Sequence, residues 1–412
     1  MYYLGNNYRI MCTLMRGGTS KGVIIRRIDL PPQPEIRDRM ILRIFGSPDQ
    51  NQIDGLGGGT SLTSKLAIVG PPGRAGADIS YTFGQVGLDN SVIDYAPTCG
   101  NMATAVGLYA VEEGLVTLTE PVTRVHIYNT NIQKVIIAEV PVRNGQVQYE
   151  GDFSIDGVPG SSAKIMLDYP GSEGAFTKQL LPTGQPVDLI ELNDGRSFHV
   201  TVIDAANVVV FVRAEELGLT GKELKHDLTS DVMAALEHIR VKVGKQIGLI
   251  KNGDRVTPDT HALPKISFVS SPKDYQTMRD QLTAKGDIDV LARYISMGTL
   301  HKAFAVSGSV ALAAATTIEG TIPNQILASS ASKGNLRIGH PSGQIYIEIE
   351  VNKTNNDYHV KRAAIGRTAR RLMDGYAYVP LSTLVQSAEA IDQAAIRHMV
   401  KDHQGLHINS GS

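Results

Sequence analysis

A series of motifs occurs twice along this chain in the same order, and this internal repeat restricts the fold more than any other feature of the sequence. Each half contains a strand broken by small or polar residues, an amphipathic helix, a strand that begins near a lysine, and an alanine-rich helix. The spacing between matching motifs grows steadily along the chain, as it does when small insertions follow a duplication. The sequence therefore predicts an α+β fold of two similar domains with a cleft between them.

The same motifs set the expected boundaries. The matching pairs are the broken strands at 9–27 and 198–212, the helices at 37–46 and 232–244, the lysine strands at 64–69 and 264–269, the helices that follow Cys99 and Ala305, and the strands at 125–134 and 336–345. The helices at 37–46 and 232–244 are each expected to end at a glycine, Gly46 and Gly244. We predict a first domain at 1–184, a second at 185–380 and a helical extension at 381–412. Apolar residues of that extension fall on one helix face: Leu384, Ala388, Ile391, Ala395 and Met399.

Cys99 lies at the predicted start of a helix rich in small apolar residues. The unpaired N–H groups and the positive end of the helix dipole favour a thiolate there, and the thiolate is the reactive form of cysteine. The alternative is that Cys99 is a small buried hydrophobic residue, as free cysteines commonly are. The second half has Ala305 to Ser309 at the matching position. The chain therefore lacks the two facing thiols with which a racemase could invert a carbon.

Lys65 is the second candidate for moving a proton. It follows a loop rich in glycine and hydroxyl residues, at 54–64, whose backbone N–H groups are suited to holding an anion. The loop lacks the glycine-lysine spacing of a nucleotide-binding P-loop, so the expected ligand is a carboxylate and not a nucleotide phosphate. A lysine that serves as a base at neutral pH needs its pKa lowered by burial or by a cationic neighbour, such as Arg16 or Lys21.

Other candidates have structural alternatives of their own. Arg16, Thr19 and Ser20 lie where the first strand is broken, and they are expected to bind a carboxylate or to form an ordinary bulge. His301 precedes the second alanine-rich helix as a substrate ligand or a structural histidine. The segment 339–343 is predicted to be a turn, and Cys12 is predicted to be part of the core.

The composition excludes several classes of function. The chain has 412 residues, a net charge of −1, 42 % hydrophobic and 20 % charged residues, which gives no reason to expect a nucleic-acid or membrane partner. Two cysteines and a start without a signal-peptide pattern predict a cytoplasmic protein with reduced thiols. The eleven histidines do not cluster with cysteines or carboxylates, so no metal site is expected.

An ordered set of short motifs makes the chain resemble a known family. These motifs are Met15–Gly22, Gly46–Asp49, Gln52–Gly55, Thr63–Lys65, Cys99–Asn101, Asp156–Pro159, Leu181–Gly184, Met297–Gly298 with Leu300–His301, Gly339–Gly343, and Arg367–Arg370 with Met373 and Gly375. Together they resemble the 2-methylaconitate cis-trans isomerase family, which includes methylitaconate delta-isomerase, 4-oxalomesaconate tautomerase and aconitate delta-isomerase. The resemblance runs from about Arg9 to Pro380. It implies a diaminopimelate epimerase-like fold with the active site between two domains.

The resemblance also implies roles for particular residues. Lys65 and Cys99 match the proposed proton-transfer pair of that family, and the Gly-Gly-Thr-Ser and Cys-Gly-Asn loops are expected beside the carboxylates of the substrate. The predicted substrate-binding residues are Arg16, Gly18, Thr19, Ser20, Thr63, Ser64, Gly100, Asn101, His301, Ser307 and Gly308. No cofactor is implied. A homodimer is one assembly that the sequence allows.

These observations predict a cofactor-independent isomerase that moves a C=C double bond, or changes its geometry, in a small unsaturated di- or tricarboxylate. Aconitate, 2-methylaconitate and methylitaconate are the expected substrates, and the sequence leaves open whether Lys65 or Cys99 is the base. The alternatives are a tautomerase for an oxalomesaconate-type keto acid, a two-base epimerase, and a carboxylate-binding protein without activity.

Overall fold

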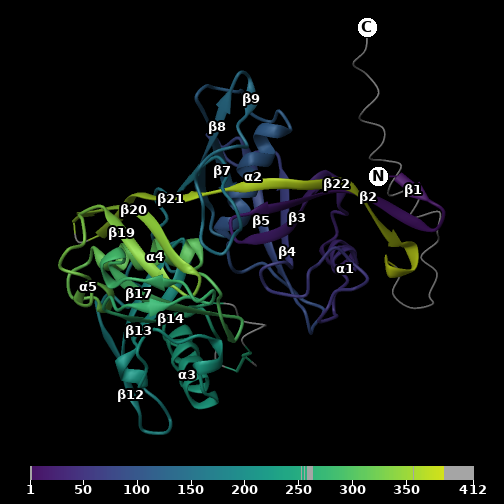
Figure 1. Cartoon of the computed structure of the whole chain (residues 1–412). Helices are drawn as coiled ribbons and strands as arrows, with labels where there is room; N and C mark the ends of the chain where they lie inside the picture. Colours follow the sequence, from purple (N-terminus) through teal and green to yellow (C-terminus); the bar gives the residue numbers. More distant parts are fainter. Residues whose placement is uncertain (1, 252, 255, 258–262, 356, 385–412) are drawn as a thin grey trace.

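The computed structural model describes residues 2–384 except 252, 255, 258–262 and 356 (Figure 1). In the first half of the chain the elements are β1 (Tyr2–Leu4), β2 (Asn7–Gly17), β3 (Ser20–Arg26), α1 (Pro34–Phe45), β4 (Lys65–Gly70), β5 (Ile79–Val86), β6 (Ile93–Asp94), α2 (Gly100–Glu112), β7 (Val122–Asn129), β8 (Lys134–Arg143), β9 (Gln146–Val147) and β10 (Ile165–Asp168).

The second half begins with β11 (Asp188–Glu191). It continues with β12 (Ser197–Ala205), β13 (Asn207–Arg213), α3 (Ser230–Gln246), β14 (Lys265–Ser270), β15 (Tyr275–Gln276), β16 (Leu282–Thr283), β17 (Val290–Ser296), β18 (Thr299–Leu300), α4 (Val306–Thr316), α5 (Ile322–Gln325), β19 (Asn335–His340), β20 (Gly343–Thr354), β21 (Asp357–Arg367) and β22 (Ala369–Pro380).

The strands of the two halves pair in the same pattern. In the first half β2 and β3 are antiparallel, β3 and β4 parallel, β4 and β5 antiparallel, β5 and β7 parallel, and β7 and β8 antiparallel. In the second half β12, β13, β14, β17, β19 and β20 follow with the same alternation. The α+β fold of two similar units, predicted from the repeated motifs, is confirmed.

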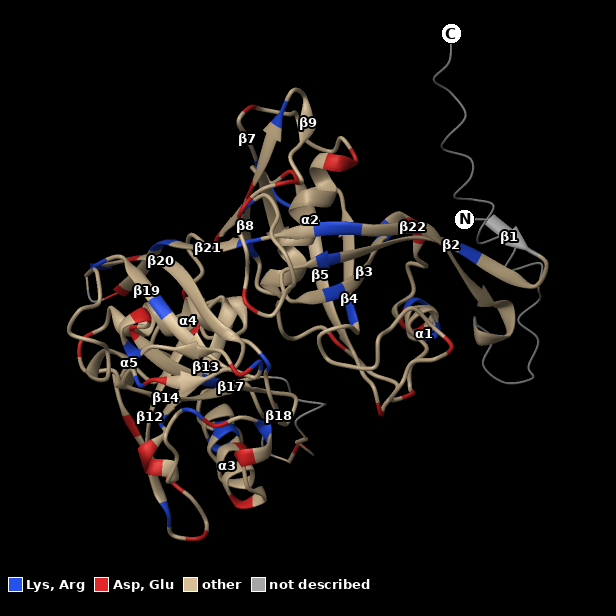
Figure 2. Ribbon diagram, in the orientation of Figure 1, with Lys and Arg blue, Asp and Glu red and all other residues tan. Residues whose placement is uncertain are grey.

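Each half encloses one helix. All residues of α2 from Gly100 to Val111 are buried, and so is every residue of α4. Helix α2 packs against β2, β7, β8 and β22, whereas α4 packs against β12, β13 and β20. Helix α4 carries no charged residue and is tan throughout in Figure 2. Because a helix that is buried on all sides has no polar face, both segments need the small apolar residues that the sequence supplies.

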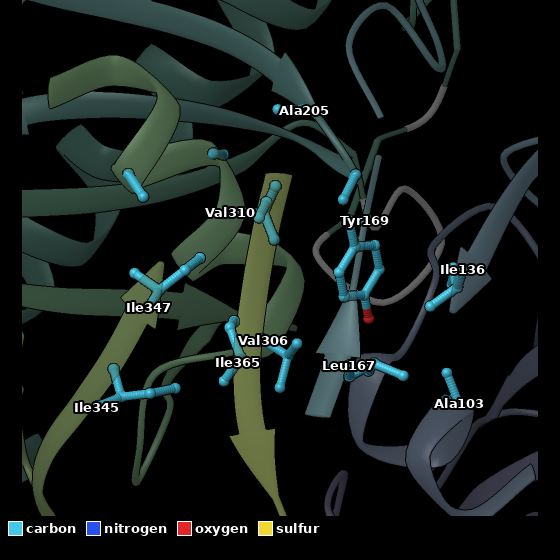
Figure 3. Close-up of a cluster of buried hydrophobic side chains, with 14 of the residues drawn as sticks. Ala103, Ile136, Leu167, Tyr169, Ala205, Val306, Val310, Ile345, Ile347 and Ile365 are labelled. Carbon is cyan, nitrogen blue, oxygen red and sulfur yellow. The ribbon is translucent and has the colours of Figure 1, made fainter. Parts of the chain in front are cut away.

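The two halves share one apolar core. Figure 3 shows Ala103 of α2 with Ile136 and Leu167 from the first half, and Val306 and Val310 of α4 beside strands of the second half. Tyr169 lies between these groups in the same cluster. The N-terminal ends of α2 and α4 therefore come close together, and a Cβ atom on Gly100 would lie 2.4 Å from Val306 Cγ1.

A long C-terminal stretch of β-structure connects the halves. Strand β21 pairs with β20 of the second half and with β10 of the first, and β22 then pairs with β2 along its whole length. Figure 1 shows β21 and β22 as a nearly straight yellow-green ribbon across the molecule. The boundaries at 184 and 380 stay predictions, but residues 369–380 extend the sheet of the first half. Of the predicted extension, residues 385–412 lie outside the described residues.

The two outer helices end differently. Helix α1 ends as predicted, because Gly46 follows it with a left-handed φ of 74°. The prediction that the second helix ends at Gly244 is wrong, since Gly244 lies inside α3. A Cβ atom there would lie 2.5 Å from Ile250 and 2.9 Å from Pro264, so this glycine serves close packing instead of termination. Within the described residues, no helix is both long and apolar enough to cross a membrane.

Replacing Gly107 by alanine tests the tight enclosure of α2. The new Cβ atom would lie 2.4 Å from Ala138 Cβ on β8. We expect the free energy of unfolding to fall by about 1–3 kcal/mol from overpacking, although alanine favours a helix by about 1 kcal/mol over glycine. Gly286→Ala is the control, because no heavy atom lies within 4 Å of its added Cβ. Urea unfolding measures both variants, and a Gly107→Ala protein as stable as the wild type would contradict this account.

Candidate active site

A cavity lies between the two halves, where α2 and α4 begin. Lys65, Cys99 and Asn101 line it from the first half, and Lys265, Tyr294 and Ser307 line it from the second. The first N–H groups of a helix have no partner within the helix, and they carry the positive end of its dipole. Two helix N-termini and two lysines at one cavity make it suited to an anion.

Cys99 is the residue directly before α2, as the sequence predicted. Its backbone is extended, with φ −137° and ψ 107°, and its side chain makes no capping hydrogen bond. The backbone position is fixed instead, because Ala103 N donates to Cys99 O (3.0 Å) and Tyr81 Oη donates to the same oxygen (3.1 Å). Cys99 is partly exposed whereas Cys12 is buried, and burial raises the pKa of Cys12 to about 12. Cys99 lines the cavity, and its thiol makes no capping hydrogen bond to the helix.

Lys65 is the first residue of β4, and only 9 % of it is exposed. Its Nζ donates to Gln85 Oε1 at 3.0 Å and lies 5.1 Å from the centre of the Phe83 ring. Gln85 is the register partner of Lys65 on β5, and its Nε2 donates to Ser64 O (3.0 Å). This chain of bonds holds the amine of Lys65 at the wall of the cavity.

The turn between β2 and β3 supports the start of α2. Asn101 Nδ2 donates to Thr19 Oγ1 (3.0 Å) and to Ser20 Oγ (3.1 Å). A Cβ atom on Gly17 would lie 1.9 Å from Asn101 O, and one on Gly18 would lie 2.0 Å from Asn101 Oδ1. The turn needs both glycines, because it could not otherwise approach the helix. Ser20, Gly100 and Asn101 line the cavity, while Thr19 binds Asn101 from outside the cavity wall.

Several predicted binding residues contact other parts of the protein. Arg16 Nη1 donates to Gly18 O (3.1 Å), Thr368 O (3.0 Å) and Thr368 Oγ1 (2.9 Å). Thr63 Oγ1 is 2.8 Å from Thr60 Oγ1, and Ser64 Oγ donates to Gln52 Oε1 (2.6 Å). These side chains are not part of the cavity wall, and they stabilise the loops that carry Ser20 and Lys65.

In the second half, His301 and Ser307 line the cavity. Burial lowers the pKa of His301 to about 4, so the ring is neutral at pH 7, and its Nδ1 lies 2.9 Å from Ala303 O. Ser307 Oγ accepts a bond from Asn207 Nδ2 (3.2 Å). Gly308 lies against Tyr294, since an added Cβ would be 2.6 Å from the ring. Among the described residues, no group of three or more His, Cys, Asp or Glu could hold a metal ion.

Lys265, Asn207 and Tyr294 are among the lining residues that were absent from the predicted set. Lys265 begins β14 as Lys65 begins β4, and this match was visible in the repeat. Asn207 lies in the break of the second strand pair. The matching break of the first half contains Thr19 and Ser20, which are predicted to bind the substrate. Tyr294 gave no signal in the sequence, because its position depends on the packing of β17 below α4.

The chain is similar to known proteins along nearly its whole length. The family model described as PrpF protein matches residues 7–380. A 3-methylitaconate isomerase of Eubacterium barkeri is 42 % identical, with 93 % of this chain and 100 % of that protein covered. A 2-methyl-aconitate isomerase of Shewanella oneidensis is 39 % identical (90 % and 97 % covered). A 4-oxalomesaconate tautomerase of Pseudomonas putida is 37 % identical (91 % and 97 % covered).

Solved structures agree with these similarities. A methylitaconate-delta-isomerase is 42 % identical, covers 94 % of this chain and 100 % of its own, and superimposes with a TM-score of 0.77. A hydroxyproline epimerase from Agrobacterium vitis is 11 % identical and has a TM-score of 0.53, with 90 % and 93 % covered. The second similarity concerns the fold alone, and it places this chain among epimerase-like folds.

Two buried tyrosines near Cys99, Tyr81 and Tyr294, provide a matched test of the hydrogen bonding around the site. Burial raises the pKa of Tyr81 and Tyr294 well above the ordinary value. The hydroxyl of Tyr81 donates to Cys99 O, whereas that of Tyr294 has no partner among the described residues. We expect Tyr81→Phe to lower the free energy of unfolding by about 1 kcal/mol, because it removes a hydrogen bond. Tyr294→Phe should leave it unchanged or higher in ligand-free protein. Equal losses in urea unfolding would contradict this difference.

Proposed function

The chain belongs to the PrpF protein family, and we propose that it shifts an allylic proton in a small unsaturated polycarboxylate with Lys65 and Cys99 as the proton carriers. It is an isomerase that acts on unsaturated carboxylates, as its relatives are. One observation carries the assignment of the two residues. Lys65 and Cys99 line the same cavity, and neither side chain is neutralised by a described carboxylate.

The reaction begins when one member of the pair removes a proton from the carbon beside the double bond. The electrons of the broken C–H bond enter the conjugated system and form a dienolate, whose charge spreads onto a carboxylate. The other member of the pair then gives a proton to the far carbon, and the double bond moves. The base is the Lys65 amine with the Cys99 thiol as acid, or the Cys99 thiolate with the Lys65 ammonium as acid.

The dienolate carries more charge inside the cavity than the substrate did, so it needs donors that are already in place. Residues at the start of α2 and α4 line the cavity, and the first N–H groups of a helix have no partner within it, so these groups can serve as donors without rearrangement. Rotation about the bond that is single in the dienolate, before the proton returns, would change the geometry of the double bond. The same site thus supports both a shift of the bond and a cis-trans change.

A two-base epimerase is a poorer match to this cavity. The residue directly before α4, in the position that Cys99 occupies before α2, is Ala305. Alanine carries no exchangeable proton, so two thiols cannot act from opposite faces of a carbon. A shift between two carbons requires only one thiol and one amine on the same side of the site.

The named relatives guide the choice of substrates to be tested. Methylitaconate, 2-methylaconitate and the aconitate isomers come first because the methylitaconate and methylaconitate isomerases are 42 % and 39 % identical. Oxalomesaconate comes second because the tautomerase is 37 % identical. NMR spectra of each acid after incubation with the enzyme would identify which double bond moves.

We expect Lys65→Met to reduce turnover by roughly 10²–10⁴-fold, the usual contribution of a general acid or base. Cys99→Ser should also be impaired, since a hydroxyl keeps a hydrogen bond but has a far higher pKa than a thiol. Lys285→Met and Cys12→Ala are the matched controls, because Lys285 is exposed outside the cavity wall and Cys12 is in the core. Wild-type turnover in Lys65→Met would remove the lysine from the mechanism.

The fate of the proton is a sharper test. A lysine ammonium and a thiol both exchange hydrogen with water, so in D₂O the returning proton is replaced by deuterium. We expect deuterium in the product at the carbon that receives the proton, together with a slower rate when the allylic position of the substrate is deuterated. NMR and mass spectrometry measure both effects.

Reversible addition of the Cys99 thiol to the double bond is the competing mechanism. Rotation in the adduct followed by loss of the thiol would change the geometry without breaking an allylic C–H bond. Product without deuterium, formed by an active Lys65→Met protein but not by Cys99→Ala, would replace the proton shift by this addition.

A further inference from the structure

Lys265 occupies, in the second half, the position that Lys65 occupies in the first. Each lysine is the first residue of a strand that pairs in parallel with the second strand of the broken pair. The register partners are Gly22 for Lys65 and Val209 for Lys265. Only 6 % of Lys265 is exposed, and its side chain lines the same cavity.

The ammonium group of Lys265 is poorly satisfied by the protein. Its Nζ donates to Ser296 Oγ at 3.3 Å, and it forms no ion pair with a described carboxylate. A buried cation with so few partners is costly unless an anion binds beside it.

Several charged groups surround Lys265. Asp94 from β6 and Glu237 from α3 favour its charged form, whereas Arg240 from α3 and Lys65 from β4 disfavour it. Burial is the largest influence and lowers the pKa of Lys265 to about 8. The group is therefore mostly charged at pH 7 and loses its proton as the pH rises through about 8.

A second polar pair accompanies Lys265, as one accompanies Lys65. In the first half, Asn101 on the helix donates to Ser20 on the strand (3.1 Å); in the second, Asn207 on the strand donates to Ser307 on the helix (3.2 Å). Asn101 and Ser307 are both second residues of their helices, and Ser20 and Asn207 both begin the second strand. The amide is on the helix in the first half and on the strand in the second, and the hydroxyl is on the opposite element in each case. Both halves therefore have an amide–hydroxyl hydrogen bond between the strand and the helix.

Each half thus presents a lysine, an amide–hydroxyl pair and a helix N-terminus to one cavity. We propose that Lys265, with Ser296, Ser307 and the start of α4, forms a second carboxylate subsite that binds the substrate across from Lys65 and Cys99. This inference rests on the proposed function and narrows its substrate class. The substrate carries at least two separated carboxylates, one of them held by each half. Lys265 binds the substrate and does not move the proton.

Direct binding separates this subsite from the chemistry. Propane-1,2,3-tricarboxylate, glutarate and butyrate carry three, two and one carboxylates and contain no C=C bond, so none can react by an allylic shift. We expect Lys265→Met to weaken calorimetric binding of the tricarboxylate roughly 30-fold or more, since a buried charge partner is lost. Its effect on butyrate should be small. Lys302→Met is the matched control for general electrostatics, because Lys302 is exposed beside the neighbouring cleft.

The deuterium experiment distinguishes a binding residue from a proton carrier. At saturating substrate in D₂O, Lys265→Met should still incorporate deuterium, with a raised KM, whereas Lys65→Met should not. Loss of incorporation in Lys265→Met at unchanged affinity would overturn the subsite and make Lys265 a proton carrier. Wild-type affinity for the tricarboxylate in Lys265→Met would overturn it as well. Ser307→Ala provides a second test if Lys265→Met does not fold, and it should weaken the same ligand.

The proposed function can fail separately from this subsite. If no unsaturated acid is turned over by the wild type, the proton shift fails while the calorimetric comparison still decides the subsite. If the wild type turns over an unsaturated acid but Lys265→Met binds the tricarboxylate as tightly as the wild type, only the subsite fails.

The pH dependence gives an independent measurement. A carboxylate favours the charged form of Lys265, so affinity for the tricarboxylate should be full below pH 8 and decline as the pH rises through about 8. Lys265→Met should lack this decline, because the titrating group is gone. A decline of the same size in both proteins would assign it to another group and contradict the role of Lys265.

Discussion

The burial of two entire helices is the constraint on which the rest of the structure depends. Every residue of α4 and nearly every residue of α2 is enclosed by strands. Where strands approach such a helix closely its residues must be small, and the 2.4 Å between an added Cβ on Gly107 and Ala138 Cβ shows how little room remains there. The helix ends cannot be enclosed in the same way, because their first N–H groups need partners. The two N-termini therefore open onto one cavity, and the positive dipole ends make that cavity suited to an anion.

The duplicated framework and the chemistry have different symmetry. Strand pairing, helix position, the lysine that begins a strand and the bond between strand and helix all occur in both halves. The thiol does not, because Ala305 stands where Cys99 stands in the first half. A site with two equivalent halves would act equally on both faces of a substrate. With a single thiol, the first half is suited to proton transfer, and the role proposed for the second half is to bind a carboxylate.

Much of this arrangement could be predicted from the sequence, because it depends on short-range patterns. The strand that begins at Lys65 and the helix that begins after Cys99 follow from hydrophobic periodicity and the residues at the ends. Gly244 shows the limit of such patterns, since the sequence does not distinguish a glycine required for close packing from a glycine that ends a helix. Tyr294 shows another, because a residue in the middle of a strand can be assigned to a cavity only when the packing of distant elements is known.

Arg16 shows how a residue predicted to bind substrate can act on the site from a distance. Its guanidinium contacts Thr368, which is 352 residues away in the chain, at the point where β21 passes into β22. Gly18 N donates to Thr368 O at the same point (2.8 Å), so the turn at 17–20 is tied to the strand that runs across both halves. Thr19 and Ser20 of this turn accept hydrogen bonds from Asn101 and so position it at the start of α2. Because β21 also pairs with β20 and β10, one continuous stretch of chain fixes the first helix terminus relative to the second half. The distance between the two helix N-termini at the cavity is therefore set by the backbone pairing of these strands, and Arg16 supports that frame through its hydrogen bonds to Thr368.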